Sequence, residues 1–315
     1  MVRPLKNRDS DHFFNKLAKI HVAILITGLL LSAGIAHSQE KSASKTILWS
    51  LFLPGGGHFY LGQPGAGNAY LLTEGLLLIA GRSVEQYLAP GEWNFFYINT
   101  LKVHELNIFT SYRESRILNE NAGYTTPIDR TVLHQLILAP FKWKNIKSPY
   151  VYGAFLAGIA INAAEGYLNP QRKSFDSVSG INIMNTPFNR EGGTALYEGM
   201  WLTLSLNAAV CEECAYRGVM QAEFEEMLGK NAGLFVSSGI FGLGHVTNWA
   251  SGKSWAYGGI ATLSGLYLGW LFQKEGYHLE KPIAAHFWFN VAAGTTLFLM
   301  DPQNNPIGIR VNFSF

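Results

Sequence analysis

Long apolar segments recur through the second half of this 315-residue chain, and they constrain its fold more than any other feature. In a bilayer, backbone N–H and C=O groups must be satisfied within the segment, so stretches of this kind are expected to form helices. Glycines recur within them, as close packing between membrane helices requires. The sequence therefore predicts an all-α fold, a polytopic membrane helix bundle. The segments are 151–164, 195–210, 232–241, 255–272 and 283–300.

The charge content supports this fold class and excludes some functions. Charged residues are 15% of the chain, against roughly 25% in soluble domains. The net charge is +2 and no basic run is present, so no nucleic-acid partner is expected. Cys211 and Cys214 are the only cysteines, and they lack both the strand-to-helix context of a redox pair and the second pair of a structural zinc site. We expect them to be packing residues.

The first 38 residues have the pattern of a secretory signal. Basic residues precede the apolar run 22–31, and the small residues Ala36 and Ser38 stand before a cleavage point. We predict a signal peptide or an uncleaved N-terminal signal anchor over 1–38. The chain is therefore expected to be a multi-pass membrane protein in contact with the lipid bilayer, in a bacterial inner membrane.

Three further regions are predicted. Residues 39–148 form a membrane-associated N-terminal region, in which Pro54 and the glycines that follow it break an apolar helix into a hairpin. Within this region, 101–118 is typical of an amphipathic helix near the membrane interface. Residues 149–300 contain the apolar helices described above, and 301–315 form a polar tail.

Charges interrupt the apolar pattern at residues 212–217. Each ionisable group costs roughly 2.5–3.5 kcal/mol at mid-bilayer, so such groups are rare unless they are paired and functional. Glu213 and Arg217 stand four residues apart, carboxylate first, which favours a helical ion pair. Glu212 has no partner at that spacing. An unpaired carboxylate beside a paired one suggests a general base, although a helix that ends at the membrane interface would also explain these charges.

Two more polar sites follow in the apolar helices. His245 ends a glycine-rich helix, whereas His286 and Asn290 stand four residues apart within the last helix and so share one face. Taken singly, each has a plain explanation as a helix cap or an interhelical hydrogen bond. Taken together with Glu212, they are expected to meet in one site. The bundle is therefore predicted to carry catalytic groups on three or more helices.

The order Glu-Glu-x-x-x-Arg, Phe-x-x-x-His, His-x-x-x-Asn resembles the signature of the CPBP family. These are the CAAX-protease and bacteriocin-processing intramembrane peptidases, which include Rce1-type prenyl-protein proteases and the Abi proteins. The resemblance covers roughly residues 150–300 and predicts a CPBP-like intramembrane protease domain over 149–300. All three motifs are complete: Glu212, Glu213 and Arg217; Phe241 and His245; His286 and Asn290.

The resemblance implies an endopeptidase that cleaves a peptide or membrane-protein substrate with an activated water. Glu212 would be the general base, and His245 would hold and polarise the water. His286 and Asn290 would donate hydrogen bonds to the oxyanion. The remaining motif residues would be structural support: Glu213, Arg217 and Phe241.

A metal and a second class of function stay open from the sequence. Zinc (Zn²⁺) could be held by Glu212, His245 and His286 with a water in the last position, although we favour a site without an obligatory metal. The alternative to an enzyme is a catalytically silent CPBP/Abi-like membrane scaffold or self-immunity protein. The complete motif set favours the enzyme, since a scaffold has no need of an unpaired Glu212.

Overall fold

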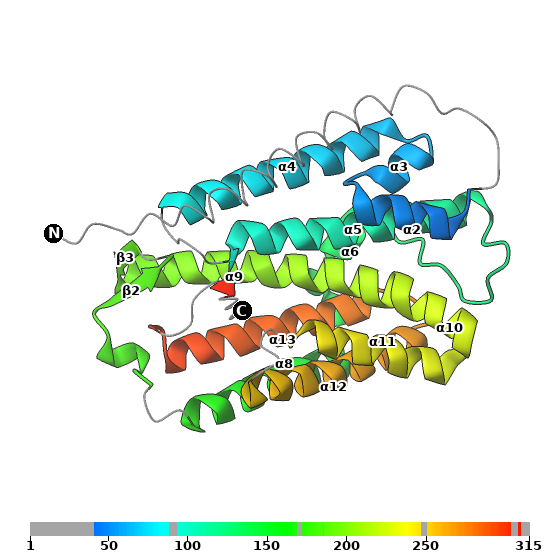
Figure 1. Ribbon diagram of the computed structural model, residues 1–315. Coiled ribbons are helices and arrows are strands. Elements are labelled where there is room, and N and C mark those ends of the chain that lie inside the picture. The colour runs from blue at the N-terminus through cyan, green and yellow to red at the C-terminus, as the bar shows by residue number, and fades with distance from the viewer. Residues whose placement is uncertain are drawn as a thin grey trace.

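A computed structural model describes residues 41–87, 93–168, 172–184, 186–246, 251–303 and 308–309. The fold is all-α, as the sequence predicts. Long helices lie alongside one another, and strands within the described residues form two short two-stranded sheets (Figure 1). The predicted signal or anchor over 1–38 and most of the polar tail 301–315 lie outside the described residues.

The apolar segments of the second half all lie in helices, which confirms the prediction made from their composition. Two of the described helices, α8 and α13, are long and apolar enough to cross a bilayer. The helices that contain the apolar segments are α8 (Pro149–Leu168), α9 (Arg190–Glu212), α11 (Lys230–Gly244), α12 (Gly252–Lys274) and α13 (Glu280–Met300).

The N-terminal part of the described residues begins with α2 (Ala43–Phe52), α3 (Gly56–Tyr60), α4 (Pro64–Tyr87) and α5 (Phe95–Leu118). The chain turns after α2 at Pro54 and Gly55. Gly55 has φ +77°, and a Cβ there would lie 2.1 Å from the backbone oxygen of Gly67, so only glycine fits. The turn is held from α5, because the Gly55 N–H donates to Asn107 Oδ1 at 3.1 Å.

One face of α4 is apolar and exposed. Leu72, Leu76 and Ile79 follow helical spacing, and each is at least 60% exposed. An apolar stripe without a protein partner is expected to contact lipid in a membrane protein.

Helix α5 lies between the α2–α4 hairpin and α9, so it is an internal helix of the bundle (Figure 1). It begins at Phe95, where the Asn94 side chain accepts the Phe96 and Tyr97 backbone N–H groups as an N-cap. Many of its buried side chains are polar. The sequence predicted an interfacial helix over 101–118, and the inward polar face of α5 explains why its amphipathic pattern was misleading.

Helix α13 is the centre of the second half and packs on α8 and α9. Helices α11 and α12 approach closely through small residues. A Cβ at Gly242 would meet Thr262 Oγ1 and the Gly258 carbonyl, and one at Gly265 would lie 3.2 Å from Ser238. The recurring glycines therefore serve close helix packing, as predicted.

The remaining elements connect or extend these helices. A π-helix, Glu213–Gln221, continues α9 without a break into α10 (Ala222–Leu228). The others are β1 (Trp93–Asn94) paired with β4 (Gly308–Ile309), β2 (Gly180–Ile183) paired with β3 (Thr186–Asn189), α6 (Leu133–Ile137), α7 (Trp143–Ile146), and the 3₁₀ turns Ala139–Phe141 and Phe175–Ser177.

Candidate active site

The two adjacent carboxylates lie where α9 changes into the π-helix. Glu212 is the last residue of α9 and Glu213 the first of the π-helix, and both side chains are buried. A π-helix is rare and occurs most often at functional sites. The four-residue spacing of Glu213 and Arg217 predicted an ordinary helix and did not indicate a π-helix.

Glu213 forms the predicted ion pair with Arg217. Arg217 Nη1 lies 3.0 Å from Glu213 Oε1, and both side chains are almost fully buried. Arg217 Nη2 also donates to the Gly265 carbonyl of α12 at 3.2 Å, and its guanidinium lies over the Phe241 ring of α11. The pair therefore joins the π-helix to two other helices.

His286 of α13 contacts both carboxylates. Its Nδ1 lies 2.7 Å from Glu213 Oε1, and its Nε2 lies 3.8 Å from Glu212 Oε2. A carboxylate only accepts hydrogen bonds, so Nδ1 carries a proton and donates to Glu213. Glu213 therefore fixes the ring of His286 and the direction of Nε2, a function that the sequence did not assign to it.

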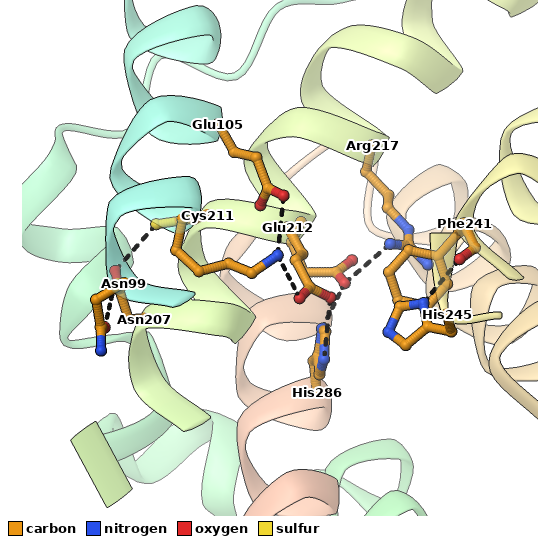
Figure 2. Close-up of polar contacts among 11 residues, drawn as sticks. Asn99, Glu105, Asn207, Cys211, Glu212, Arg217, Phe241, His245 and His286 are labelled. Atoms are coloured by element: carbon orange, nitrogen blue, oxygen red, sulfur yellow. Dashed lines mark hydrogen bonds and ion pairs between the residues drawn. The ribbon is translucent and has the colours of Figure 1, made fainter. Parts of the chain in front are cut away.

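Glu212 is paired with a lysine from α5, so the sequence-based view of it as unpaired is wrong. Lys102 Nζ lies 2.9 Å from Glu212 Oε1 and 2.8 Å from Glu105 Oε1 (Figure 2). The pairing joins residues 110 positions apart in the chain, which helical spacing cannot reveal. Glu212 Oε2, the other oxygen, is buried and has no hydrogen-bond partner.

His245 ends α11 beside Phe241 (Figure 2). Its Nδ1 donates to the Phe241 carbonyl at 2.7 Å, because a carbonyl can only accept. This leaves Nε2 as the free nitrogen of an exposed ring. The Phe241 ring packs against the rings of both His245 and His286. Phe241 thus contacts the side chains of three other motif residues, Arg217, His245 and His286.

Asn290 lies one turn beyond His286 on α13 and is partly buried. Its backbone carbonyl accepts a hydrogen bond from Trp201 Nε1 at 2.9 Å, which ties α13 to α9. Direct contacts thus join Glu212, Glu213, Arg217 and His286, whereas His245 is linked to this group through Phe241.

The cysteines are buried and not bonded to each other. Cys211 Sγ lies 3.1 Å from Asn207 Oδ1, and Asn207 donates in turn to Asn99 of α5 at 2.6 Å. Their place is in the packing between α9 and α5, in line with the expectation from the sequence.

The side chains present do not fit a zinc site. Zinc needs three or four donors that converge on one point. Within the described residues, no three His, Cys, Asp or Glu side chains are arranged to hold a metal ion.

Comparison with known proteins identifies the domain that holds these motifs. Residues 195–292 match the family model described as type II CAAX prenyl endopeptidase Rce1-like, a family of membrane-embedded helical proteases. The match runs from α9 to α13 and includes every predicted site residue from Glu212 to Asn290. No curated protein and no solved structure matches the chain significantly. Residues 195–292 are therefore similar to the Rce1-like family, in agreement with the resemblance to CPBP peptidases that the three motifs carry.

Proposed function

We propose that this chain is an intramembrane endopeptidase in which Glu212 activates water to hydrolyse a peptide bond. The observation that supports this most strongly is the arrangement of Glu212 Oε2 and His286 Nε2. They lie 3.8 Å apart, too far for a direct hydrogen bond and suitable for one water that contacts both. The Oε2 atom is also the carboxylate oxygen that no hydrogen bond occupies.

The reaction begins with proton transfer. Water bound between Glu212 Oε2 and His286 Nε2 gives a proton to Glu212 as its oxygen attacks the substrate carbonyl. The free Nε2 of His245 accepts the second water hydrogen as a hydrogen bond and orients the attack. Glu212 then passes its proton to the departing amine, so the carboxylate is restored and the peptide bond is broken.

The tetrahedral oxyanion needs donors directed at it. With Nδ1 fixed by Glu213, His286 directs Nε2 at the oxyanion as one of these donors. The Asn290 amide, one turn further along the same helix, is the second donor in this proposal. Glu213 and Arg217 hold the geometry, because each is bound to a group on another helix.

The substrate class is a peptide or membrane protein that can enter the bilayer. The test compares membrane peptides from cells that carry the wild-type chain, Glu212→Gln or Glu198→Gln. Glu198 is a matched control, since it lies on the same helix and accepts a hydrogen bond from Thr295 of α13. An uncleaved peptide should accumulate with Glu212→Gln alone. Identical peptide profiles in all three strains would remove the proposal.

The competing function is the silent CPBP/Abi-like scaffold or self-immunity protein. One observation favours it: the ion pair with Lys102 gives Glu212 a structural use that needs no chemistry. The same strains separate the two functions, because Lys102 stays paired with Glu105 in Glu212→Gln, so a scaffold should keep its fold and its cellular effect. The endopeptidase should lose it.

A further inference from the structure

The N-terminal region supplies a charged group to the site that the family match does not include. Lys102 lies on α5, well before the matched residues 195–292. Its side chain is 15% exposed, and its ammonium group lies between Glu212 Oε1 and Glu105 Oε1. A buried lysine with two carboxylate partners is held at one point in the bundle, unlike a lysine at a membrane surface.

This contact makes the two oxygens of Glu212 unequal. Oε1 is held by Lys102, whereas Oε2 faces His286 Nε2 and accepts no hydrogen bond. A carboxylate rotates about its terminal torsion with little preference, so an unheld Glu212 would have no fixed base atom. The ammonium group therefore selects which oxygen meets the water.

The charges around Glu212 form an alternating row across four elements (Figure 2). It runs from Glu105 and Lys102 on α5, through Glu212, to His286 on α13, and ends with Glu213 and Arg217 of the π-helix. Each charge has an opposite or hydrogen-bonding neighbour, and this order is the one that lowers the energy of buried charges. Lys102 is the cation that faces Glu212 in this row.

We propose that Lys102 is a positioning residue for Glu212, and that Glu105 anchors Lys102. This inference rests on the proposed function and deepens it, because it makes α5 part of the catalytic unit. Lys102 does not touch the substrate. It holds the Glu212 carboxylate ionised and oriented, so that Oε2 receives the proton of the water.

The first test measures the ion pair without any substrate. A hydrophobic carbodiimide reacts with protonated buried carboxyl groups, and mass spectrometry locates the adduct on Glu212. At neutral pH, we expect Glu212 to be labelled about tenfold faster in Lys102→Met than in the wild type. Loss of the ion pair should raise the protonated, reactive fraction of Glu212 by about that factor. Lys102→Arg should be labelled like the wild type. Equal labelling of Lys102→Met and the wild type would overturn the proposal.

A matched control accounts for general effects of losing a lysine. Lys281 lies 2.6 Å from Glu275 and is partly buried, but its carboxylate partner is outside the site. Lys281→Met should leave Glu212 labelling unchanged. If Lys102→Met fails to fold, Glu105→Gln tests the anchor instead. A displaced Lys102 should slow cleavage in the second test, and a folded Glu105→Gln that cleaves like the wild type would contradict the role of the anchor.

The second test separates positioning from packing. The full chain in lipid nanodiscs is given a farnesylated CAAX peptide with an internal quencher. We expect Lys102→Met to lower kcat by up to about 100-fold, as misplacement of a catalytic group does. KM should stay within about twofold, and Lys102→Arg should recover most of the rate. A Lys102→Met enzyme as fast as the wild type, or faster, would overturn the proposal.

The two tests fail independently. If the wild type cleaves no probe but Lys102→Met still increases Glu212 labelling, the proposed function falls and the ion pair stands. If the wild type cleaves and labelling of Glu212 does not respond to Lys102→Met, the positioning role falls and the endopeptidase stands.

Discussion

Glu212 and Glu213 are neighbours in the chain, but different helices hold the two carboxylates. Glu213 is bound by Arg217 from its own element and by His286 from α13. Glu212 is bound by Lys102 from α5 through one oxygen only. At the scale of single residues, both carboxylates keep one buried oxygen without a hydrogen-bond partner, but it is Oε2 of Glu212 that faces His286 Nε2, the position that the proposed water needs.

Glu213 is the residue whose loss should damage the fold most. Glu213→Gln would leave the buried guanidinium of Arg217 without its counter-charge, which costs about 3–5 kcal/mol for a buried pair. Thermal unfolding in detergent should show a clear loss of stability. The double variant Glu213→Gln/Arg217→Met should recover part of it, because no charge is then left unpaired.

Glu191 provides the reference for this measurement. It lies on α9 as well, but its side chain is 77% exposed beside Arg190, so Glu191→Gln should have little effect. Equal stability of Glu213→Gln and Glu191→Gln would show that the buried pair does not hold the site together.

Metal removal tests the chemistry of the same residues. Because no three His, Cys, Asp or Glu side chains among the described residues are arranged to hold a metal ion, we expect cleavage to survive prolonged treatment with a strong chelator. The rate before and after chelation is the measurement. A loss of activity that added zinc restores would show that the ligands rearrange around a metal.

The element that shapes the site is the π-helix Glu213–Gln221. It lies tightly against α5 at Gly218, where an added Cβ would be 2.5 Å from the ring of the fully buried Phe109. The same α5 helix carries Lys102, seven residues before Phe109, on its inward side. The absence of a side chain at Gly218 therefore sets how closely Lys102 can approach Glu212.

Gly218→Ala should separate these two elements. We expect a loss of about 1–3 kcal/mol from overpacking, together with slower cleavage because Lys102 moves from Glu212. Thermal unfolding of the two single variants and of the double variant Gly218→Ala/Phe109→Leu gives the coupling free energy between the two positions. The double variant should be more stable than the sum of the single effects predicts, since the smaller side chain makes room.

Gly239→Ala on α11 is the control for helix propensity, because nothing lies within 4 Å of its added Cβ. This change should be neutral or slightly stabilising. If Gly218→Ala were also neutral or slightly stabilising, the close contact between α5 and the π-helix would not determine the stability of the fold.

In the whole molecule, the N-terminal helices are packed on the region that matches the Rce1-like family. The Asn207 Nδ2 donates to Asn99 Oδ1 at 2.6 Å, so α9 and α5 touch through polar side chains as well as through the ion pair. Helix α4 lies on the opposite side of the bundle from α12 (Figure 1). This arrangement makes α5 the link between the two halves.

Cross-linking can test the arrangement in membranes. In a chain with Cys211→Ala and Cys214→Ala, the pair Asn99→Cys/Asn207→Cys should react with a short bifunctional thiol reagent. The pair Leu72→Cys/Leu263→Cys, on exposed faces of α4 and α12, should not. Cross-linking is read as a shift in electrophoretic mobility after cleavage at an engineered site between the two cysteines. No shift for the first pair would contradict the packing of α5 on α9.

The sequence predicted the parts of the site that depend on local spacing. Glu213 and Arg217 stand one helical turn apart, and the apolar segments specify helices by themselves. Lys102 could not be found in this way, because contacts between distant helices leave no periodic signal. The one available clue was electrostatic: a buried Glu212 without a cation at helical spacing requires one from elsewhere, and the charged helix 101–118 was predicted to lie at the membrane interface instead of in the site.

The role that we propose for Glu212 is that of the base in an intramembrane endopeptidase. It is tested most directly by the initial rate at which the purified full chain cleaves a farnesylated CAAX peptide in nanodiscs, measured for the wild type and Glu212→Gln. We predict that kcat falls by about 100-fold or more, as loss of a general base does. The fold should be kept, because Lys102 remains paired with Glu105. Equal rates for the two proteins would contradict the account.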